Sequence, residues 1–193
     1  MPDLLTTRAQ LADVLAQLAD LLDAIGPAGS TEPTPCEDYS VNELRTHVVS
    51  WLTAFSDGIV DADGTVSDPE GVRVSGSGGD QVRRAADLID AALAGGADHA
   101  LVLGGNDLPM DVALPMILGE YQVHGWDLAV ATGNAWQPDE AGLEASLQFF
   151  PAMLTEDAQG EGKTFKPRVP VPDDASALDR LLGLTGRNPA WAP

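Results

Sequence analysis

The sequence predicts an all-α protein whose helices pack into a bundle, and three observations support this class. In several long segments apolar residues recur at three- and four-residue steps, as on one face of an amphipathic helix. Stretches rich in Gly and Pro separate these segments. At most a trace of strand is expected, in the short apolar run "HALVLGG". The connections are longer than those of a simple up-and-down bundle, so a crossover connection is compatible with the sequence.

The first predicted helix has a regular apolar stripe between Leu11 and Ile25, and Gly26 follows as its stop. Thr7 and Gln10 have the spacing of a capping box at its start. The loop "GPAGSTEPTP" then ends regular structure.

The second predicted helix starts with a capping box formed by Ser40 and Glu43. Tyr39 and Leu44 stand where a hydrophobic staple would form across this helix start. The apolar stripe then continues to Ile59.

A third helix is predicted over about 80–94, where two glycines end it. A fourth helix is expected over 109–132, with Gly133 as its stop. Apolar residues surround the fourth helix almost completely, which indicates burial on most sides. Pro115 inside it predicts a kink or a later start.

A fifth helix is predicted over 138–154, followed by an extended segment "KPRVPVP" and a short closing helix that ends at Gly186. We therefore expect a helical bundle domain over 1–160. Residues 161–193 are expected to form an extended segment and a short helix that packs back on this bundle.

Composition excludes several functional classes. The 193 residues include 30 acidic and 10 basic ones, a formal net charge of −20, so we expect no nucleic-acid partner and no membrane-surface partner. The N-terminus lacks the pattern of a signal peptide, and no segment is apolar for long enough to span a membrane. Cys36 is the single cysteine, so an intramolecular disulfide is excluded and a cytoplasmic location is expected.

Three residues on apolar helix faces form the candidate site. Glu120 and His124 are one helical turn apart, and His47 lies on the apolar stripe of the second helix. Two His and one Glu from facing helices can hold a divalent metal, and zinc sites of this composition keep a fourth position open for catalysis. Asp127 is expected to hold a ligand histidine through its second ring nitrogen, with direct ligation as a weaker alternative.

Each of these residues also has an ordinary structural interpretation. A lone histidine on an apolar stripe is more often a hydrogen-bonded core residue than a ligand, and Glu-x3-His occurs on helices by chance. The residues alone leave the metal site and the structural interpretation about equally supported.

Other residues are secondary candidates. Trp51 and Trp126 are expected in the core, although either could wall a pocket. Cys36 precedes a helix N-terminus, a position that can lower a thiol pKa, but a small buried residue is the favoured interpretation. His99 is expected in a solvated loop.

Three basic residues fall within six positions late in the chain, at Lys163, Lys166 and Arg168. They could attract an anionic group of a substrate. A solvated connector is the favoured interpretation of this segment.

Three segments, "TPCEDYSVNELRTHVVSWL", "LPMILGEYQVHGWDLAVATG" and "LLGLTGRNPAW", resemble the metal-binding DinB-like proteins. The nearest branch is similar to the N-terminal domains of mycothiol-dependent maleylpyruvate isomerases. This resemblance implies a four-helix bundle with a crossover connection and a divalent metal held by His47, Glu120 and His124. The isomerase has a further C-terminal domain for which this sequence has too few residues, so maleylpyruvate isomerisation itself is not expected.

The residues and the resemblance together give a leading functional hypothesis, a metal-dependent enzyme that uses a low-molecular-weight, mycothiol-like thiol for S-transfer or isomerisation of a small electrophile. Zinc suits the ligand set, and nickel, iron or manganese are alternatives. One rival is a hydrolase that uses metal-bound water, and another is a non-catalytic bundle that binds a metal or ligand. The oligomeric state stays open, and a homodimer is compatible with such a bundle.

Overall fold

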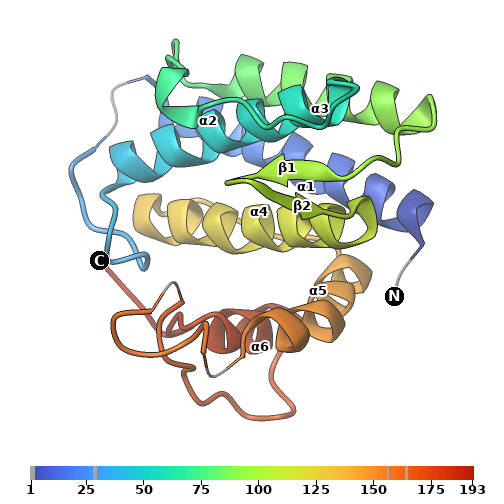
Figure 1. Cartoon of the computed structure of the whole chain (residues 1–193). Coiled ribbons are helices and arrows are strands. Elements are labelled where there is room, and N and C mark those ends of the chain that lie inside the picture. The colour runs from blue at the N-terminus through green and yellow to red at the C-terminus, as the bar shows by residue number, and fades with distance from the viewer. Residues whose placement is uncertain (1–2, 28–29, 156, 164) are drawn as a thin grey trace.

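Four long helices pack around a shared apolar core in the computed structural model (Figure 1). They are α1 (Leu4–Ile25), α2 (Val41–Val60), α3 (Gly79–Ala94) and α4 (Met110–Thr132). The structure describes residues 3–27, 30–155, 157–163 and 165–193. The predicted loop over 26–35 includes residues 28 and 29, which lie outside the described residues. The prediction of a mainly α-helical bundle is confirmed.

The order of the helices around the bundle requires a crossover connection. Both α1 and α2 pack against α3 and α4, so α1 and α2 are consecutive in the chain but lie diagonally across the bundle (Figure 1). The segment that joins them therefore crosses one end of the bundle, as the resemblance implied. This segment carries Cys36 and Tyr39 to that end.

The two N-terminal helices differ in how well their caps were predicted. Ser40 and Glu43 form the expected capping box of α2, with the Ser40 side chain and the Glu43 carboxylate each bonded to the other's backbone N–H. The predicted capping box of Thr7 and Gln10 is wrong. Helix α1 starts earlier, where the Asp3 carboxylate accepts from the Thr6 N–H at 3.0 Å, and Thr7 is buried inside the helix. Asp is a somewhat better N-cap than Thr, so N-cap preference agrees with the earlier start, which the capping-box spacing of Thr7 and Gln10 did not indicate.

Helix α4 runs continuously through Pro115, so the alternative of a later start is wrong. Proline lacks the N–H that would bond one turn back, and in the second turn of a helix this loss removes a single intrahelical bond. The helix is buried on most sides, as its sequence predicted. It packs against α1, against α2 and against the helix that follows it in the chain.

A small antiparallel hairpin precedes α4. Strands β1 (Leu101–Leu103) and β2 (Asn106–Leu108) pair across Gly104 and Gly105, and both glycines have the positive φ that a tight hairpin turn requires. The short apolar run is thus a strand, as expected. A 3-10 turn, η1 (Pro69–Gly71), lies in the long loop before α3 and packs against α2.

A second layer lies beneath α4 and contains α5 (Glu140–Met153) and α6 (Ala177–Leu184) (Figure 1). Helix α5 packs against α4, and α6 packs against α5. Residues 166–172 form neither helix nor strand, as "KPRVPVP" predicted. The C-terminal segment therefore returns toward the bundle.

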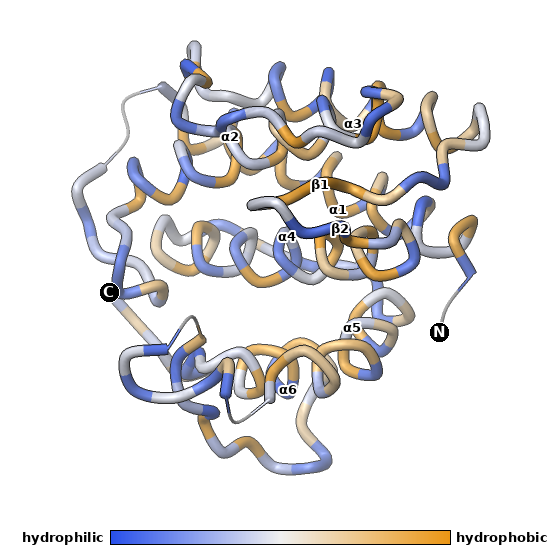
Figure 2. The backbone as a smooth tube through the Cα atoms, viewed as in Figure 1, coloured by the Kyte–Doolittle hydropathy of each residue, from blue (hydrophilic) through white to orange (hydrophobic). Residues whose placement is uncertain are grey.

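Hydropathy follows this arrangement. Hydrophobic positions of α3 face the bundle while hydrophilic ones lie at its outer edge (Figure 2). Among the described residues, each helix falls short of the length or the apolarity that a membrane crossing requires.

Candidate metal centre

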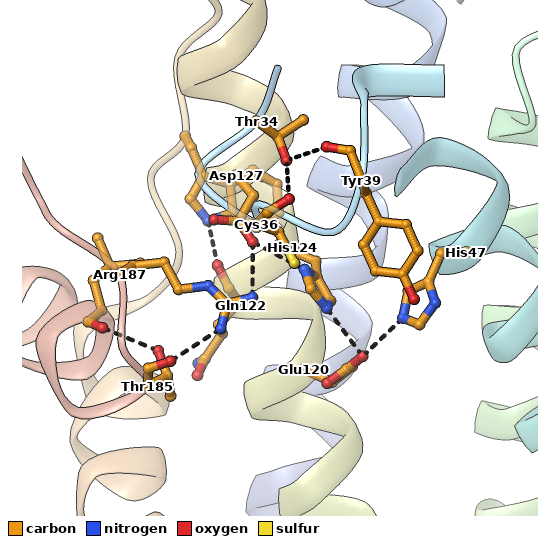
Figure 3. Close-up of polar contacts among 12 residues, drawn as sticks. Thr34, Cys36, Tyr39, His47, Glu120, Gln122, His124, Asp127, Thr185 and Arg187 are labelled. Carbon is orange, nitrogen blue, oxygen red and sulfur yellow. Dashed lines mark hydrogen bonds and ion pairs between the residues drawn. The ribbon is translucent and has the colours of Figure 1, made fainter. Parts of the chain in front are cut away.

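Two imidazoles and one carboxylate meet where α2 packs against α4 (Figure 3). The Nε2 atom of His47, on α2, lies 3.3 Å from Oε1 of Glu120, on α4. The Nε2 atom of His124, one turn further along α4, lies 3.2 Å from the same oxygen. One donor atom from each residue lies within 4.8 Å of the other two. The three residues that the sequence singled out are therefore brought together.

Asp127 holds His124 from the opposite side. Its Oδ2 atom lies 2.9 Å from Nδ1 of His124, and its side chain is fully buried. A carboxylate can only accept this bond, so Nδ1 carries the proton. In a neutral His124 ring the lone pair is then on Nε2, the atom that faces Glu120.

Arg187 is a member of this cluster that the sequence reasoning missed. Its Nη2 atom lies 3.2 Å from the same Oδ2 of Asp127 (Figure 3). A fully buried carboxylate needs a compensating partner, and this need was the one available signal that another charged residue lies nearby. Sixty residues separate Asp127 from Arg187, so helical spacing could not identify the partner.

These residues lie at a cavity of about 290 Å³. Its walls come from the segment before α2, from α2, α4 and α5, and from the C-terminal segment. The lining residues are Pro35, Cys36, Glu37, Asp38, Tyr39, His47, Gly119, Glu120, Val123, His124, Phe150, Phe165, Lys166, Thr185, Gly186 and Arg187. The Tyr39 ring packs on His47 with ring centroids 4.8 Å apart, so the staple residue of α2 is also a wall of the site.

The electrostatics of the metal-free site follow from this geometry. Burial alone would lower the pKa of His124, but the charge of Glu120 and the hydrogen bonds to Asp127 and Glu120 outweigh burial and raise this pKa to about 9. Burial would raise the pKa of Glu120, and the two histidines outweigh it and hold that pKa well below its usual range. The metal-free site therefore holds its carboxylate against at least one imidazolium.

The residues present fit a divalent cation. Two imidazole nitrogens and a carboxylate oxygen face one another from rigid helices, and the second nitrogen of His124 is held by a carboxylate, as is usual for ligand histidines. The Glu120 side chain is 35% exposed at the cavity wall, so exchangeable ligands can reach the centre of the cluster. A cation placed there would replace the proton that His124 otherwise carries.

A rival set of three potential ligands uses Cys36, His124 and Asp127, whose donor atoms also lie within 4.8 Å of one another. This set is the poorer one, because His124 Nδ1 and Asp127 Oδ2 already bond to each other. Burial also raises the pKa of the Cys36 thiol to about 11, so it stays protonated near neutral pH. Cys36 was expected to be a small buried residue, and in the structure it is half-buried at the cavity wall.

Several residues considered from the sequence lie elsewhere. Neither Trp51 nor Trp126 is among the residues that line this cavity. Trp126 lies two positions beyond His124 and so points about 200° away around α4 into the core. Trp51 packs on Phe55, with ring centroids 5.4 Å apart.

The basic residues of the C-terminal segment do not act as one group. Lys166 lines the cavity, whereas Lys163 donates to a backbone carbonyl and Arg168 donates to the Gln159 side chain and a backbone carbonyl. His99 is half-buried rather than solvated, and its Nε2 lies 3.2 Å from the Gly58 carbonyl oxygen.

Fold and site together define a class, a helical bundle that presents two histidines and a glutamate at a cavity. The family model of the mycothiol maleylpyruvate isomerase N-terminal domain matches residues 11–129. The chain belongs to this family. His47, Glu120, His124 and Asp127 fall inside the matched region, and Arg187 falls outside it.

Two curated relatives come from Mycobacterium tuberculosis, the uncharacterized protein MT0763 of strain CDC 1551 and the uncharacterized protein Rv0738 of strain H37Rv. Each is 26% identical to this chain over 155 residues, which cover 80% of this chain and 83% of the relative. No solved structure gives a significant match to the chain.

Proposed function

We propose that this protein is a metal-dependent enzyme that uses a low-molecular-weight thiol to modify a small electrophile. The observation that carries the proposal is the convergence of His47 Nε2, His124 Nε2 and Glu120 Oε1 at the wall of a cavity. Membership of a family named for a mycothiol-dependent isomerase supports a mycothiol-like thiol. Zinc is the leading candidate for the ion, with nickel, iron and manganese as alternatives.

A divalent cation would supply a Lewis acid that lowers the pKa of a thiol and so provides a nucleophilic sulfur near neutral pH. The chain's own residues do the rest. Asp127 orients His124, and Glu120 offsets positive charge in the cavity. Phe150 and Phe165 give the cavity apolar walls, which favour the carbon skeleton of a small substrate.

The first test of this proposal is metal content. The protein is purified without chelators or affinity metals, and bound elements are measured by mass spectrometry. We expect about one divalent ion per chain in the wild type and in Cys36→Ser, and loss of that ion in His47→Ala and Glu120→Gln. Stoichiometric metal in both His47→Ala and Glu120→Gln would remove the proposed site. Loss of metal in Cys36→Ser alone would favour the rival ligand set.

A second test separates thiol chemistry from hydrolysis. Cobalt-substituted protein is mixed with mycothiol or a simpler thiol, and its visible spectrum is recorded. A new sulfur-to-cobalt absorption, together with turnover that requires thiol, is the expected result. Turnover of an ester or amide without thiol would instead support the hydrolase. If both activities are absent, the result would support a non-catalytic metal-binding bundle.

A further inference from the structure

We infer that Arg187, from the C-terminal segment beyond the family match, is a positioning residue of the candidate metal centre. It holds Asp127, and through Asp127 it holds His124 with Nε2 directed at Glu120. The inference rests on the proposed function and deepens it, because it makes a segment outside the family match over residues 11–129 part of the same site.

The contacts of Asp127 support this role. The side chain of Asp127 is fully buried, and its Oδ2 accepts from His124 Nδ1 at 2.9 Å and from Arg187 Nη2 at 3.2 Å. Its other oxygen, Oδ1, has no hydrogen-bond partner among the described residues. The carboxylate is therefore restrained through one oxygen alone. Without Arg187 a single bond to His124 would be left to fix the carboxylate, and it could rotate about its side-chain torsion.

Charge compensation points the same way. A buried carboxylate is costly unless a partner neutralises it, and a guanidinium is charged at all relevant pH values. Of the two partners of Asp127, Arg187 is the permanent cation, since a histidine that binds a metal must be neutral. The Arg187 side chain is 12% exposed, so its attraction to Asp127 is weakly screened by water.

The fold also pre-orients Arg187. Helix α6 ends in a Schellman motif, in which Arg187 N–H bonds to the Leu182 carbonyl at 2.8 Å and Gly186 N–H bonds to the Gly183 carbonyl at 3.2 Å. Gly186 has a φ of +85°, the left-handed conformation this motif requires. The second guanidinium nitrogen, Nη1, donates to the Thr185 carbonyl at 3.0 Å. Both ends of the side chain are thus fixed before it reaches Asp127.

Electrostatics alone would give the opposite effect on metal binding, and this makes the inference testable. Removing a positive charge near the site strengthens the attraction of the remaining carboxylates for a cation. Removing a positioning contact weakens metal binding, and second-sphere partners of ligand histidines are worth about 10- to 100-fold in affinity. The direction of change therefore separates positioning from a charge effect.

The experiment measures the Zn²⁺ dissociation constant of the full chain by competition with a chromogenic chelator at fixed pH. We expect Arg187→Met to weaken zinc binding about tenfold and Arg187→Lys to recover most of that loss. Arg180→Met is the matched control. Arg180 lies on α6, the helix that precedes Arg187, and pairs with Glu144, away from Asp127, so its loss should leave zinc affinity unchanged.

A double-mutant cycle identifies the residue through which Arg187 acts. Asp127→Asn should weaken zinc binding about 10- to 100-fold, and adding Arg187→Met to it should cause no further loss. Melting temperatures of the metal-free variants measure any purely structural effect. If Arg187→Met fails to fold, Arg187→Gln takes its place beside Arg187→Lys in the cycle.

Three outcomes would overturn the inference. The first is zinc affinity in Arg187→Met equal to or tighter than in the wild type. The second is an equal loss in Arg180→Met. The third is an additive loss in the double variant. A wild-type protein without zinc affinity would instead refute the proposed function itself.

Discussion

Glu120 is the residue on which the candidate site depends most. It lies on an apolar helix, where an isolated carboxylate would be costly, and two imidazoles and a cavity explain its presence. The position of this residue, more than that of either histidine, therefore favours a metal site over a set of hydrogen-bonded core residues.

Glu120→Gln should abolish stoichiometric metal while leaving the helical fold intact, because the amide is isosteric but lacks the charge that a dication requires. Bound metal and the far-ultraviolet circular dichroism spectrum are the two measurements. Glu140→Gln, on the exposed first turn of α5, is the control and should keep its metal. Unchanged metal content in Glu120→Gln would contradict the assigned role.

The raised pKa of His124 predicts how the metal-free protein responds to pH. The folded-state pKa is about 9, above the ordinary value of about 6.5, so the stabilisation is fully present below pH 6.5. It is lost as pH rises through 9. We expect the free energy of unfolding, measured with urea in chelator, to fall between pH 6.5 and 9, and Glu120→Gln to flatten this slope.

Zinc affinity should change in the opposite direction over the same pH range. Binding displaces the proton of His124, so the apparent affinity should rise about tenfold per pH unit while that proton is still bound. Isothermal titration calorimetry in buffers of different ionisation enthalpy counts the protons released. A pH-independent affinity without proton release would argue against His124 as a ligand.

At the residue scale, local chemistry was largely predictable from the sequence. The capping box of Ser40 and Glu43 needs only a spacing of three residues, and it is present. Glu120 and His124 needed only helical periodicity. Arg187 could not be found in this way, since its contact with Asp127 depends on how the C-terminal segment returns to α4.

At the element scale, two glycines let other elements approach α4 on either side of its site residues. A Cβ on Gly119 would lie 1.9 Å from the Phe150 ring, and one on Gly125 would lie 2.1 Å from the Trp136 ring. Because of these close approaches, α5 and the loop that carries Trp136, between α4 and α5, pack directly against the helix that carries Glu120 and His124. Burial on most sides of α4 follows from this packing.

Gly125→Ala should therefore destabilise the protein by about 1–3 kcal/mol, the usual cost of overpacking a core. Gly71→Ala is the control, because a Cβ there meets nothing within 4 Å and its φ is not positive. Its effect should stay within about 0.5 kcal/mol. Urea unfolding of both variants gives the comparison, and equal stabilities would show that the contact of α4 with Trp136 is readily relieved.

Helix positions were predictable because apolar periodicity and Gly or Pro stops are local signals. The start of α1 was missed because Thr7 and Gln10 match the spacing of a capping box, although Asp3, which caps the helix, is the better N-cap residue. The helix through Pro115 shows the same limit, because neighbouring helices can stabilise a helix that its own sequence would interrupt.

At the scale of the whole molecule, the net charge of −20 is the dominant electrostatic feature. Self-repulsion of excess like charge destabilises a compact state, and salt screens it. We expect the free energy of unfolding of the metal-free protein to rise as sodium chloride is raised from about 0.01 to 0.5 M. A fall over this range would mean that ion pairs such as Arg8–Asp90 outweigh the general repulsion.

The sequence-based prediction of a mainly α-helical bundle is confirmed, and the crossover implied by the family resemblance is present. The helices α5 and α6 were expected from local patterns, but their arrangement as a layer against α4 and the contact of the C-terminal segment with the cavity depend on long-range packing. That segment nonetheless supplies Phe165, Lys166 and Arg187 to the cavity walls.

The most direct test of the central claim is diffraction from crystals of the purified protein at wavelengths on both sides of the zinc absorption edge. The account predicts a single anomalous peak between His47, Glu120 and His124, present above the edge and absent below it. If zinc is not the native ion, the peak should respond at the edge of nickel, iron or manganese instead. Zinc-soaked crystals with no anomalous density among these three side chains would contradict the account.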